Sequence, residues 1–271
     1  MSSIVELSPE GQARLSREYE SATLADCFVY HWFDLPDGSV IPGVWDLRKR
    51  WHAYLGNYDF AGKTVFEVGP ASGFLTFKME RLGADVTCFD IAPGTSPDVM
   101  PLPGVDHYKT QREFAEHHHS VRAAWWYFHR LFASQSKATY GNIYQIPEEL
   151  GTYDVSVVGA VLLHLATPFA ALTQIARRTK NTIVISDRYY PHLDGGAFME
   201  INPHKGAFGP MAWWRISPQA CIHMLHANGF EPRSVSYHQH NHHPTRDLKT
   251  FRTHKFFTVV ADRLLGSGGG G

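Results

Sequence analysis

The chain has 271 residues, of which 44% are hydrophobic and 13% aromatic, so it can bury a full core and is not a disordered protein. Its formal net charge of −1 argues against bulk nucleic acid as its main partner. No segment approaches the roughly 18 consecutive apolar residues of a membrane helix, and residues 1–20 lack the apolar core of a signal peptide. We therefore expect a cytoplasmic protein without a membrane partner.

The first 60 residues are expected to form an extension that precedes the main domain. Ser8 and Pro9 have the residue types of an N-cap and a first helical turn, which predicts an amphipathic helix within residues 8–29. In residues 31–51, prolines and Asp-Gly or Pro-Gly pairs separate aromatic residues. This pattern predicts a hairpin or loop, followed by a helix from about Asp46.

Residues Lys63–Asp90 contain the most informative pattern in the chain. Thr64–Val68 is a short run of β-branched and aromatic residues, typical of a buried parallel strand. Gly69 then allows a sharp turn and the close approach of a ligand, and Gly73 allows the following helix to pack tightly. A second strand ends at Asp90, where a carboxylate can accept hydrogen bonds from both hydroxyls of a ribose. The pattern predicts a site for a nucleotide cofactor.

The acid before the glycine turn, Glu67, indicates which cofactor is bound. The spacing is E-x-G-x-x-x-G, whereas dinucleotide folds use G-x-G-x-x-G to bring bare backbone to a pyrophosphate. A carboxylate at this point would repel pyrophosphate, but it would attract an ammonium group or organise amides around an amino-acid group. Together with Gly69, Gly73 and Asp90, it resembles motif I of class I S-adenosylmethionine (SAM) methyltransferases. The alternative is an ordinary strand-to-helix turn in another doubly wound protein.

The rest of the chain alternates predicted strands and helices. After a proline-rich loop we expect an aromatic helix from about Gln111 to Ser134 and a loop at Gly141–Ile146. Two strands follow, Tyr153–Val158 and Thr182–Ser186, with a helix near Phe169–Thr179 between them. The chain then continues with a helix that ends at Gly229 and a hairpin of Ser234–His238 and Lys255–Val260. This order predicts an α/β, Rossmann-like class I methyltransferase fold: a seven-stranded, mostly parallel sheet with an antiparallel last strand. The expected divisions are the extension at 1–60, the methyltransferase domain with lid-forming inserts at 61–265, and a linker remnant at 266–271.

Several segments resemble the family of the bacterial tRNA wobble-uridine (5-oxyacetate) carboxymethyltransferase and its short homologues. They are WFDLPDGSVIPG at 32–43, Phe60–Val65, YDVSVVGAVLLHLATPFAAL at 153–172, and Trp213–Phe230. The resemblance covers most of residues 31–260 and implies that SAM lies over the carboxyl ends of strands one, two and four. The chain departs from the family at Leu163, where a tyrosine is expected, and at Tyr30-His31, where a lysine would meet a carboxylated cofactor. These departures favour SAM itself as the donor.

The motif and the resemblance together define the candidate cofactor residues. The motif contributes Glu67, Gly69, Ser72, Gly73 and Asp90, and the resemblance adds Ile91, Asn142, Ile143 and Gly159, with Trp45 and Lys49 as weaker members. Lys49 belongs to the run Arg48-Lys49-Arg50, which is either a solvated helix face or a grip for a phosphate group.

Methyl transfer from a sulfonium is an in-line displacement, so holding the acceptor about 3 Å from the methyl group can supply most of the rate. His164 is the candidate general base, because a histidine titrates near neutral pH and this one follows the fourth strand at the carboxyl edge of the sheet. The alternative role is a buried histidine that shapes the pocket floor. On the acceptor side we expect the aromatic residues Tyr127, His129, Trp213 and Trp214. The resemblance adds Arg252 there as a weaker member.

Histidine clusters at 117–119 and 238–243 raise the question of a metal site. Alternate residues of a strand share a face, so His238 and His240 could bind one ion. No carboxylate or cysteine pattern accompanies them, so we predict a solvated or weakly metal-binding patch and no functional metal. The three cysteines, Cys27, Cys88 and Cys221, occur singly and are expected to be buried thiols.

The sequence therefore predicts a SAM-dependent methyltransferase that acts on oxygen or nitrogen of a small molecule or short peptide. A tRNA wobble-base modifying enzyme is the alternative that the resemblance suggests, and a basic groove in the folded protein would favour it. A catalytically inactive SAM-binding module is a third possibility, distinguished by cofactor binding without methyl transfer.

Overall fold

A computed structural model describes residues 3–202 and 212–264. Its centre is an eight-stranded sheet with the order β3-β11-β12-β8-β7-β4-β5-β6. These strands are β3 (Trp45–Asp46), β4 (Thr64–Val68), β5 (Asp85–Ile91), β6 (Lys137–Gly141), β7 (Tyr153–Gly159), β8 (Thr179–Arg188), β11 (Phe230–His242) and β12 (Arg252–Arg263). The strands from β8 to β6 run parallel, and β12 is antiparallel to both of its neighbours. The predicted fold class is confirmed.

The eighth strand was not predicted. It is the two-residue β3, which pairs with the end of β11 through Trp45 opposite His242 and Asp46 opposite Asn241. The helix expected from about Asp46 is therefore wrong at its start, and only the short α2 (Trp51–Tyr54) is helical in this region. The Asp46 carboxylate accepts hydrogen bonds from the backbone and guanidinium of Arg48, which favours a turn over a helix here.

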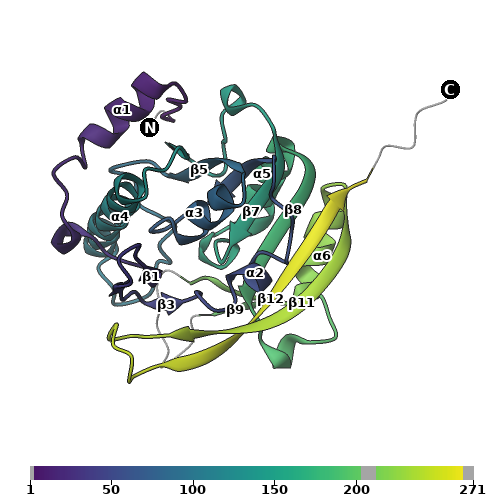
Figure 1. The fold of residues 1–271 in the computed structure, drawn as a ribbon. Helices are drawn as coiled ribbons and strands as arrows, with labels where there is room; N and C mark the ends of the chain where they lie inside the picture. Colours follow the sequence, from purple (N-terminus) through teal and green to yellow (C-terminus); the bar gives the residue numbers. More distant parts are fainter. Residues whose placement is uncertain (1–2, 203–211, 265–271) are drawn as a thin grey trace.

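Helices cover both faces of the sheet. One face carries α3 (Phe74–Arg81) and α4 (His107–Leu131), and the other carries α5 (Pro168–Arg178) and α6 (Pro218–Ala227). Figure 1 shows α3 and α4 beside the N-terminal segments, with α6 behind β11 and β12. Neighbouring residues of β4 serve the two cores: Val65 packs with α3 and α4, and Phe66 packs with α5. Burial on both faces explains why this strand reads as a continuous apolar run.

The N-terminal extension is less helical than predicted. Helix α1 (Pro9–Arg17) begins where expected, with the Ser8 hydroxyl accepting a hydrogen bond from Gly11 N at 3.1 Å, but it ends twelve residues before the predicted limit of residue 29. A capping box between Thr23 and Asp26 starts a separate turn, η1 (Leu24–Asp26). Beyond it, β1 (Phe33–Asp34) and β2 (Val40–Ile41) form the predicted hairpin.

Strand β6 was missed, and the N-terminus completes its edge. Ile4 forms an antiparallel bridge with Tyr140, and the Gln12 side chain bonds to the backbone of Ala138. These contacts satisfy the outer side of a strand that would otherwise expose its polar backbone. The remaining elements are a small sheet of β9 (Met199–Ile201) and β10 (Trp214–Ile216), and the short turns η2 (Glu148–Leu150), η3 (Leu162–His164) and η4 (Pro191–Leu193).

Other predictions were confirmed with adjusted limits. The long aromatic helix runs from His107 to Leu131, because the Asp106 carboxylate caps it through Lys109 N at 2.9 Å. The C-terminal hairpin is longer than expected, since β11 and β12 pair from Phe230 opposite Arg263 to His242 opposite Arg252. The three cysteines are buried and free. No helix in residues 3–202 and 212–264 has the length and apolar character that a membrane span requires. The predicted linker at 266–271 lies outside the described residues.

Candidate active site

A cavity of about 890 Å³ opens beyond the carboxyl ends of β4, β5, β7 and β8. This is where open α/β sheets bind their ligands, and the volume is within the usual range for small-molecule sites. Of the sequence-predicted residues, those that line it are Trp45, Glu67, Gly69, Asp90, Ile91, Asn142, Ile143, Gly159 and His164. The parallel strands bring these residues together because their carboxyl ends meet at one edge of the sheet.

The glycine turn forms the floor of this cavity. Gly69 has φ +67°, and its amide donates a 2.9 Å hydrogen bond to the Phe89 carbonyl at the end of β5. A Cβ on Gly69 would lie 2.6 Å from Val161 Cγ2, so any side chain would collide with the opposite wall. Ala71 also has a left-handed backbone, at φ +49°, which is strained for a residue with a Cβ. The turn therefore leaves space for a ligand beside Gly69, and it carries backbone strain at Ala71.

Gly73 and Ser72 belong to the motif but do not line the cavity. A Cβ on Gly73 would lie 2.5 Å from Phe77 Cε2 and 2.9 Å from Trp125 Cδ1, so this glycine allows α3 to pack against α4. The Ser72 hydroxyl is buried and accepts hydrogen bonds of 3.2 Å from the amides of Tyr30 and His31. Both residues thus position the walls of the site instead of facing a ligand.

Glu67 lines the cavity and is also tied to its surroundings. Its side chain is 3% exposed, and Oε2 accepts hydrogen bonds from the Thr76 hydroxyl at 2.5 Å and from the Cys88 thiol at 3.4 Å. Burial raises the pKa of Glu67 to about 7, against the lowering effect of these two hydrogen bonds. The carboxyl group therefore fixes α3 and β5 relative to the glycine turn.

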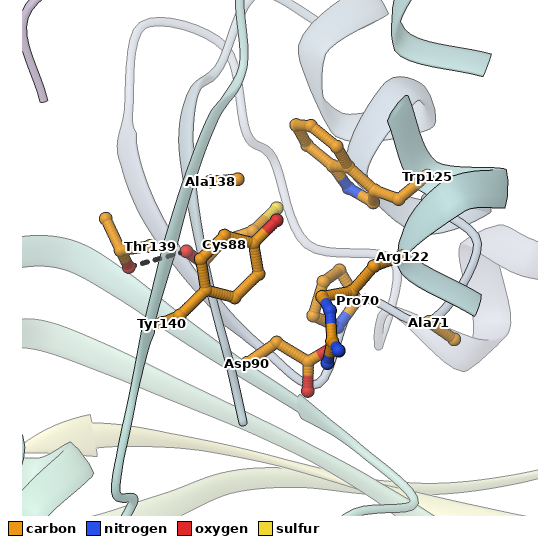
Figure 2. A pocket seen from close by; sticks show the side chains of 9 residues that line it. All are labelled: Pro70, Ala71, Cys88, Asp90, Arg122, Trp125, Ala138, Thr139 and Tyr140. Atoms are coloured by element: carbon orange, nitrogen blue, oxygen red, sulfur yellow. Dashed lines mark hydrogen bonds between the residues drawn. The ribbon is translucent and has the colours of Figure 1, made fainter. Parts of the chain in front are cut away.

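Asp90 stands at the carboxyl end of β5, where the sequence places it. Its Oδ1 accepts a 2.8 Å hydrogen bond from Ile91 N. Figure 2 shows the Arg122 guanidinium beside it, where both residues line a second, very small cavity of about 10 Å³. Arg122 is 3% exposed, and its Nε donates to the Tyr19 hydroxyl at 3.2 Å. The sequence did not indicate this buried cation beside the candidate ribose-binding carboxylate.

The loop after β6 and the proline-rich loop close one side of the cavity. Asn142 Oδ1 accepts a 2.9 Å hydrogen bond from Tyr144 N. The Tyr144 hydroxyl donates to the Asp98 carboxylate, which also accepts from Ala166 N at 2.7 Å. The Trp213 indole donates to the Asp98 carbonyl at 3.0 Å. Asp98 therefore joins three segments that are far apart in the sequence, and it holds the proline-rich loop beside the site.

The tryptophan pair expected on the acceptor side supports the site from outside. Trp213 is held by Asp98, and the Trp214 indole donates a 2.9 Å hydrogen bond to the Leu165 carbonyl. Neither ring lines the cavity, whereas the preceding residue, Ala212, does. The Trp213 ring thus anchors the proline-rich loop, and the Trp214 ring anchors the residue that follows His164. His164 itself is half-buried and lines the cavity.

Four further predicted residues are not brought to the cavity. Lys49 and Arg252 are exposed. Tyr127 and His129 lie too far along α4, because the cavity meets this helix at His117, His118 and Val121. The His129 ring stacks on Trp125 with centroids 4.9 Å apart and is hydrogen-bonded to the Ser136 carbonyl at 3.0 Å. These two α4 residues pack within the protein.

The far end of the cavity contains residues that the sequence did not single out as ligands. They are Tyr30, His31, Arg188, His242 and Phe256, which lie beside the predicted Trp45. His31 is 9% exposed, its Nδ1 has no hydrogen-bond partner in the described part of the chain, and burial lowers its pKa to about 3. Arg188 could have been found by the rule applied to His164, since it follows a predicted strand at its carboxyl end.

The alternating histidines share a face of β11, as predicted, but the expected solvated patch is wrong here, because His238 is 4% exposed and His240 3%. His238 Nδ1 and His240 Nε2 are joined by a 2.8 Å hydrogen bond, and His238 Nε2 is hydrogen-bonded to the Thr258 hydroxyl at 2.8 Å. Burial lowers the pKa of His238 to about 4 and that of His240 to about 3. Within residues 3–202 and 212–264, no group of three histidine, cysteine or acidic side chains is arranged to hold a metal ion.

Comparison with known proteins identifies the class of fold. No protein-family profile matches the sequence, and no curated protein matches it significantly. The structure resembles a putative methyltransferase from Bacillus halodurans, with a TM-score of 0.52, 11% identity, and 76% of this chain and 94% of that one covered. It also resembles a SAM-dependent methyltransferase from Methanosarcina mazei, with a TM-score of 0.51, 14% identity, and 81% and 99% covered. The likeness is one of fold, which is that of class I SAM-dependent methyltransferases.

Proposed function

We propose that the protein is a SAM-dependent methyltransferase that acts on oxygen or nitrogen of a small molecule or short peptide. The observation that carries the proposal is the convergence of the Gly69 turn and the Asp90 carboxylate on one large cavity at the carboxyl edge of the sheet. The Gly69 position is open only because it lacks a side chain. That space and the adjacent carboxylate fit a nucleoside cofactor.

The residues divide the binding of SAM between them. Asp90 accepts hydrogen bonds from the ribose hydroxyls, and Ile91, Asn142 and Ile143 form the side of the cavity that suits a flat base. Glu67 and the backbone of the Gly69 turn lie where an amino-acid group is accommodated. The donor is SAM itself, because Leu163 and His31 offer neither the hydroxyl nor the ammonium expected for a carboxylated relative.

Bound SAM supplies an electrophilic methyl group on a sulfonium. The chain's contribution is to hold the acceptor in line with that methyl and to exclude water, which the enclosing walls Trp45, Leu163 and Phe256 favour. His164 accepts the proton that the acceptor oxygen or nitrogen loses as its new bond to carbon forms. The proposed base therefore acts on the acceptor and not on the cofactor.

The cavity favours a small acceptor over RNA. Among the lysines and arginines that the structure describes, only Arg188 lines it. A groove that follows a nucleic-acid backbone needs several such cations. The resemblance to a tRNA-modifying family nevertheless makes RNA the alternative acceptor to include in the test.

Two measurements test the proposal. Calorimetry with SAM and with its product S-adenosylhomocysteine (SAH) should show binding of both, and no heat with either at millimolar concentration would contradict it. Incubation with methyl-labelled SAM and separate small-molecule, peptide and RNA fractions should transfer label to a small molecule or peptide. Label in RNA alone would support the wobble-base alternative, and cofactor binding without transfer to any fraction would support an inactive module.

A further inference from the structure

The acceptor end of the cavity contains one strong positive charge. Arg188 is the last residue of β8, two residues beyond Ser186, which pairs with Gly159 at the end of β7. It is therefore about 7 Å further out along the strand than the predicted cofactor edge. No other arginine or lysine of the described residues lines the cavity. The position places a cation where a methyl acceptor, and not the cofactor, would lie.

The Arg188 guanidinium is held in place by neutral groups. Its Nη2 donates a 2.8 Å hydrogen bond to His254 Nδ1, and its Cζ lies 5.4 Å from the centre of the Tyr190 ring. Burial and the neighbouring Arg188 charge lower the pKa of His254 to about 4, so this imidazole is neutral at physiological pH. The side chain is thus oriented without being neutralised.

The guanidinium has no ion-pair partner within the described part of the chain. No carboxylate there lies within ion-pair distance of Arg188, and its Nε is buried without a hydrogen-bond acceptor. The adjacent Asp187 carboxylate accepts a 2.6 Å hydrogen bond from the backbone amide of Arg188 and not from its guanidinium. Burial raises the pKa of Asp187 to about 7 despite the nearby Arg188 charge. Side chains alternate along a strand, and Phe257, the strand partner of Asp187, packs in the core under α6. Leaving a buried charged donor unpaired is unfavourable, so the Arg188 guanidinium is suited to bind the anionic group of a ligand.

The walls around Arg188 are flat and aromatic. Phe256 pairs with Arg188 directly across β8 and β12, so both side chains project to the same face of the sheet. The Trp45 ring lies 5.4 Å from Phe256 and 4.7 Å from His242, measured between ring centroids. These three rings line the cavity beside the guanidinium. The arrangement fits a planar ring with a negatively charged substituent.

We propose that Arg188 binds an anionic group, a carboxylate or a phosphate, on a planar aromatic methyl acceptor. This inference rests on the proposed function, because it assumes that the far end of the cavity receives the acceptor. It narrows the acceptor from any small molecule or peptide to an aromatic acid or aryl phosphate.

Small probes test the subsite directly. Benzoate, phenyl phosphate and benzamide have the same ring, and only the first two are anions. Calorimetry on the full chain, saturated with SAH, should show that at least one anion binds about tenfold or more tightly than benzamide. Comparison of benzoate with phenyl phosphate identifies which anion the site takes. Equal binding of all three probes, or no binding of either anion, would overturn the inference.

Two variants identify Arg188 as the cause. Arg188→Gln should lower the affinity for the preferred anion to that for benzamide, and Arg188→Lys should restore part of it, because a lysine keeps the charge but loses the planar fork. The matched control is Arg177→Gln on the exposed face of α5, which should keep the anion preference. Unchanged anion binding in a folded Arg188→Gln protein would contradict the proposal.

SAH binding separates failure of the inference from failure of the proposed function. The affinity for SAH should be the same in the unmodified protein and in the Arg188→Gln, Arg188→Lys and Arg177→Gln variants, because Arg188 lies outside the proposed cofactor end of the cavity. Loss of SAH binding in the unmodified chain would refute the methyltransferase proposal, while the same probe series without SAH would still report on the anion subsite. Normal SAH binding without an anion preference would refute the inference alone.

Discussion

The amide of Gly69 donates a 2.9 Å hydrogen bond to the carbonyl of Phe89, which ties the turn after β4 to the end of β5. Asp90 is the next residue, so the same bond fixes the distance between the glycine cradle and the acid expected to bind the ribose. The glycine turn and the carboxylate are consequently held in a fixed relative position, which would favour binding of a cofactor that contacts both.

Replacement of Gly69 tests this cradle. Gly69→Ala must accept φ +67° and would place its Cβ 2.6 Å from Val161 Cγ2, so we expect both lower stability and a loss of SAH binding of tenfold or more. The matched control is Gly62→Ala, which has the same φ of +67° but no atom within 4 Å of the new Cβ. It should lose about 1 kcal/mol of stability and keep SAH binding. Equal SAH affinity in the two variants, by calorimetry, would show that the Gly69 site is not the cradle.

Asp90→Ala should weaken SAH binding about ten- to a hundredfold, because it removes charge-assisted hydrogen bonds worth about 1.5–3 kcal/mol. The control is Asp85→Ala at the start of the same strand, where the carboxylate is exposed and forms a 2.7 Å ion pair with Lys137. We expect this variant to bind SAH normally. An Asp90→Ala protein with unchanged affinity would remove Asp90 from the cofactor site.

His164→Ala should lower turnover about 10²–10⁴-fold once an acceptor is available, while SAH affinity changes by a few fold at most. The dependence of turnover on pH should lose its rise near neutrality. His223→Ala, at an exposed position on α6, is the control and should be fully active. Normal turnover with an unchanged pH profile in His164→Ala would show that this histidine only shapes the pocket.

The buried carboxyl of Glu67 gives a prediction about stability and pH. Its pKa is raised from 4.5 to about 7, so the folded state binds a proton more tightly than the unfolded chain does. Stability contributed by this group is therefore complete below pH 4.5 and declines as pH rises to about 7.

Glu67→Gln removes this titration and keeps an acceptor for Thr76. Relative to the unmodified protein, its free energy of unfolding should improve by up to about 3 kcal/mol between pH 4.5 and 7.5, measured by denaturant titration at each pH. Glu116→Gln, exposed on α4, should show no such trend. A constant difference between Glu67→Gln and the unmodified protein across this range would contradict the prediction.

Local patterns in the sequence determined the centre of the fold. The run Thr64–Val68, the left-handed turn at Gly69 and the strand that ends near Asp90 are each specified by neighbouring residues, through burial on both faces and glycine's freedom at positive φ. Strand β6 was missed because Lys137–Gly141 has no long apolar run. Its pairing with β5 and with Ile4 makes it a strand, and neither partner is close in sequence.

The residues of the candidate site likewise fall into those that local sequence patterns predicted and those that only the tertiary structure revealed. The sequence predicted that Gly69, Asp90 and His164 would meet, because each lies at or after the end of a predicted strand, and the parallel strands do bring all three to one cavity. It misplaced Tyr127 and His129, since helical periodicity fixes the face of α4 but not how far along its axis the cavity extends. Only the tertiary structure brought His31, Trp45, Arg188 and Phe256 to one wall. Their proximity results from long-range strand pairing and packing, which the order of residues in one segment does not encode.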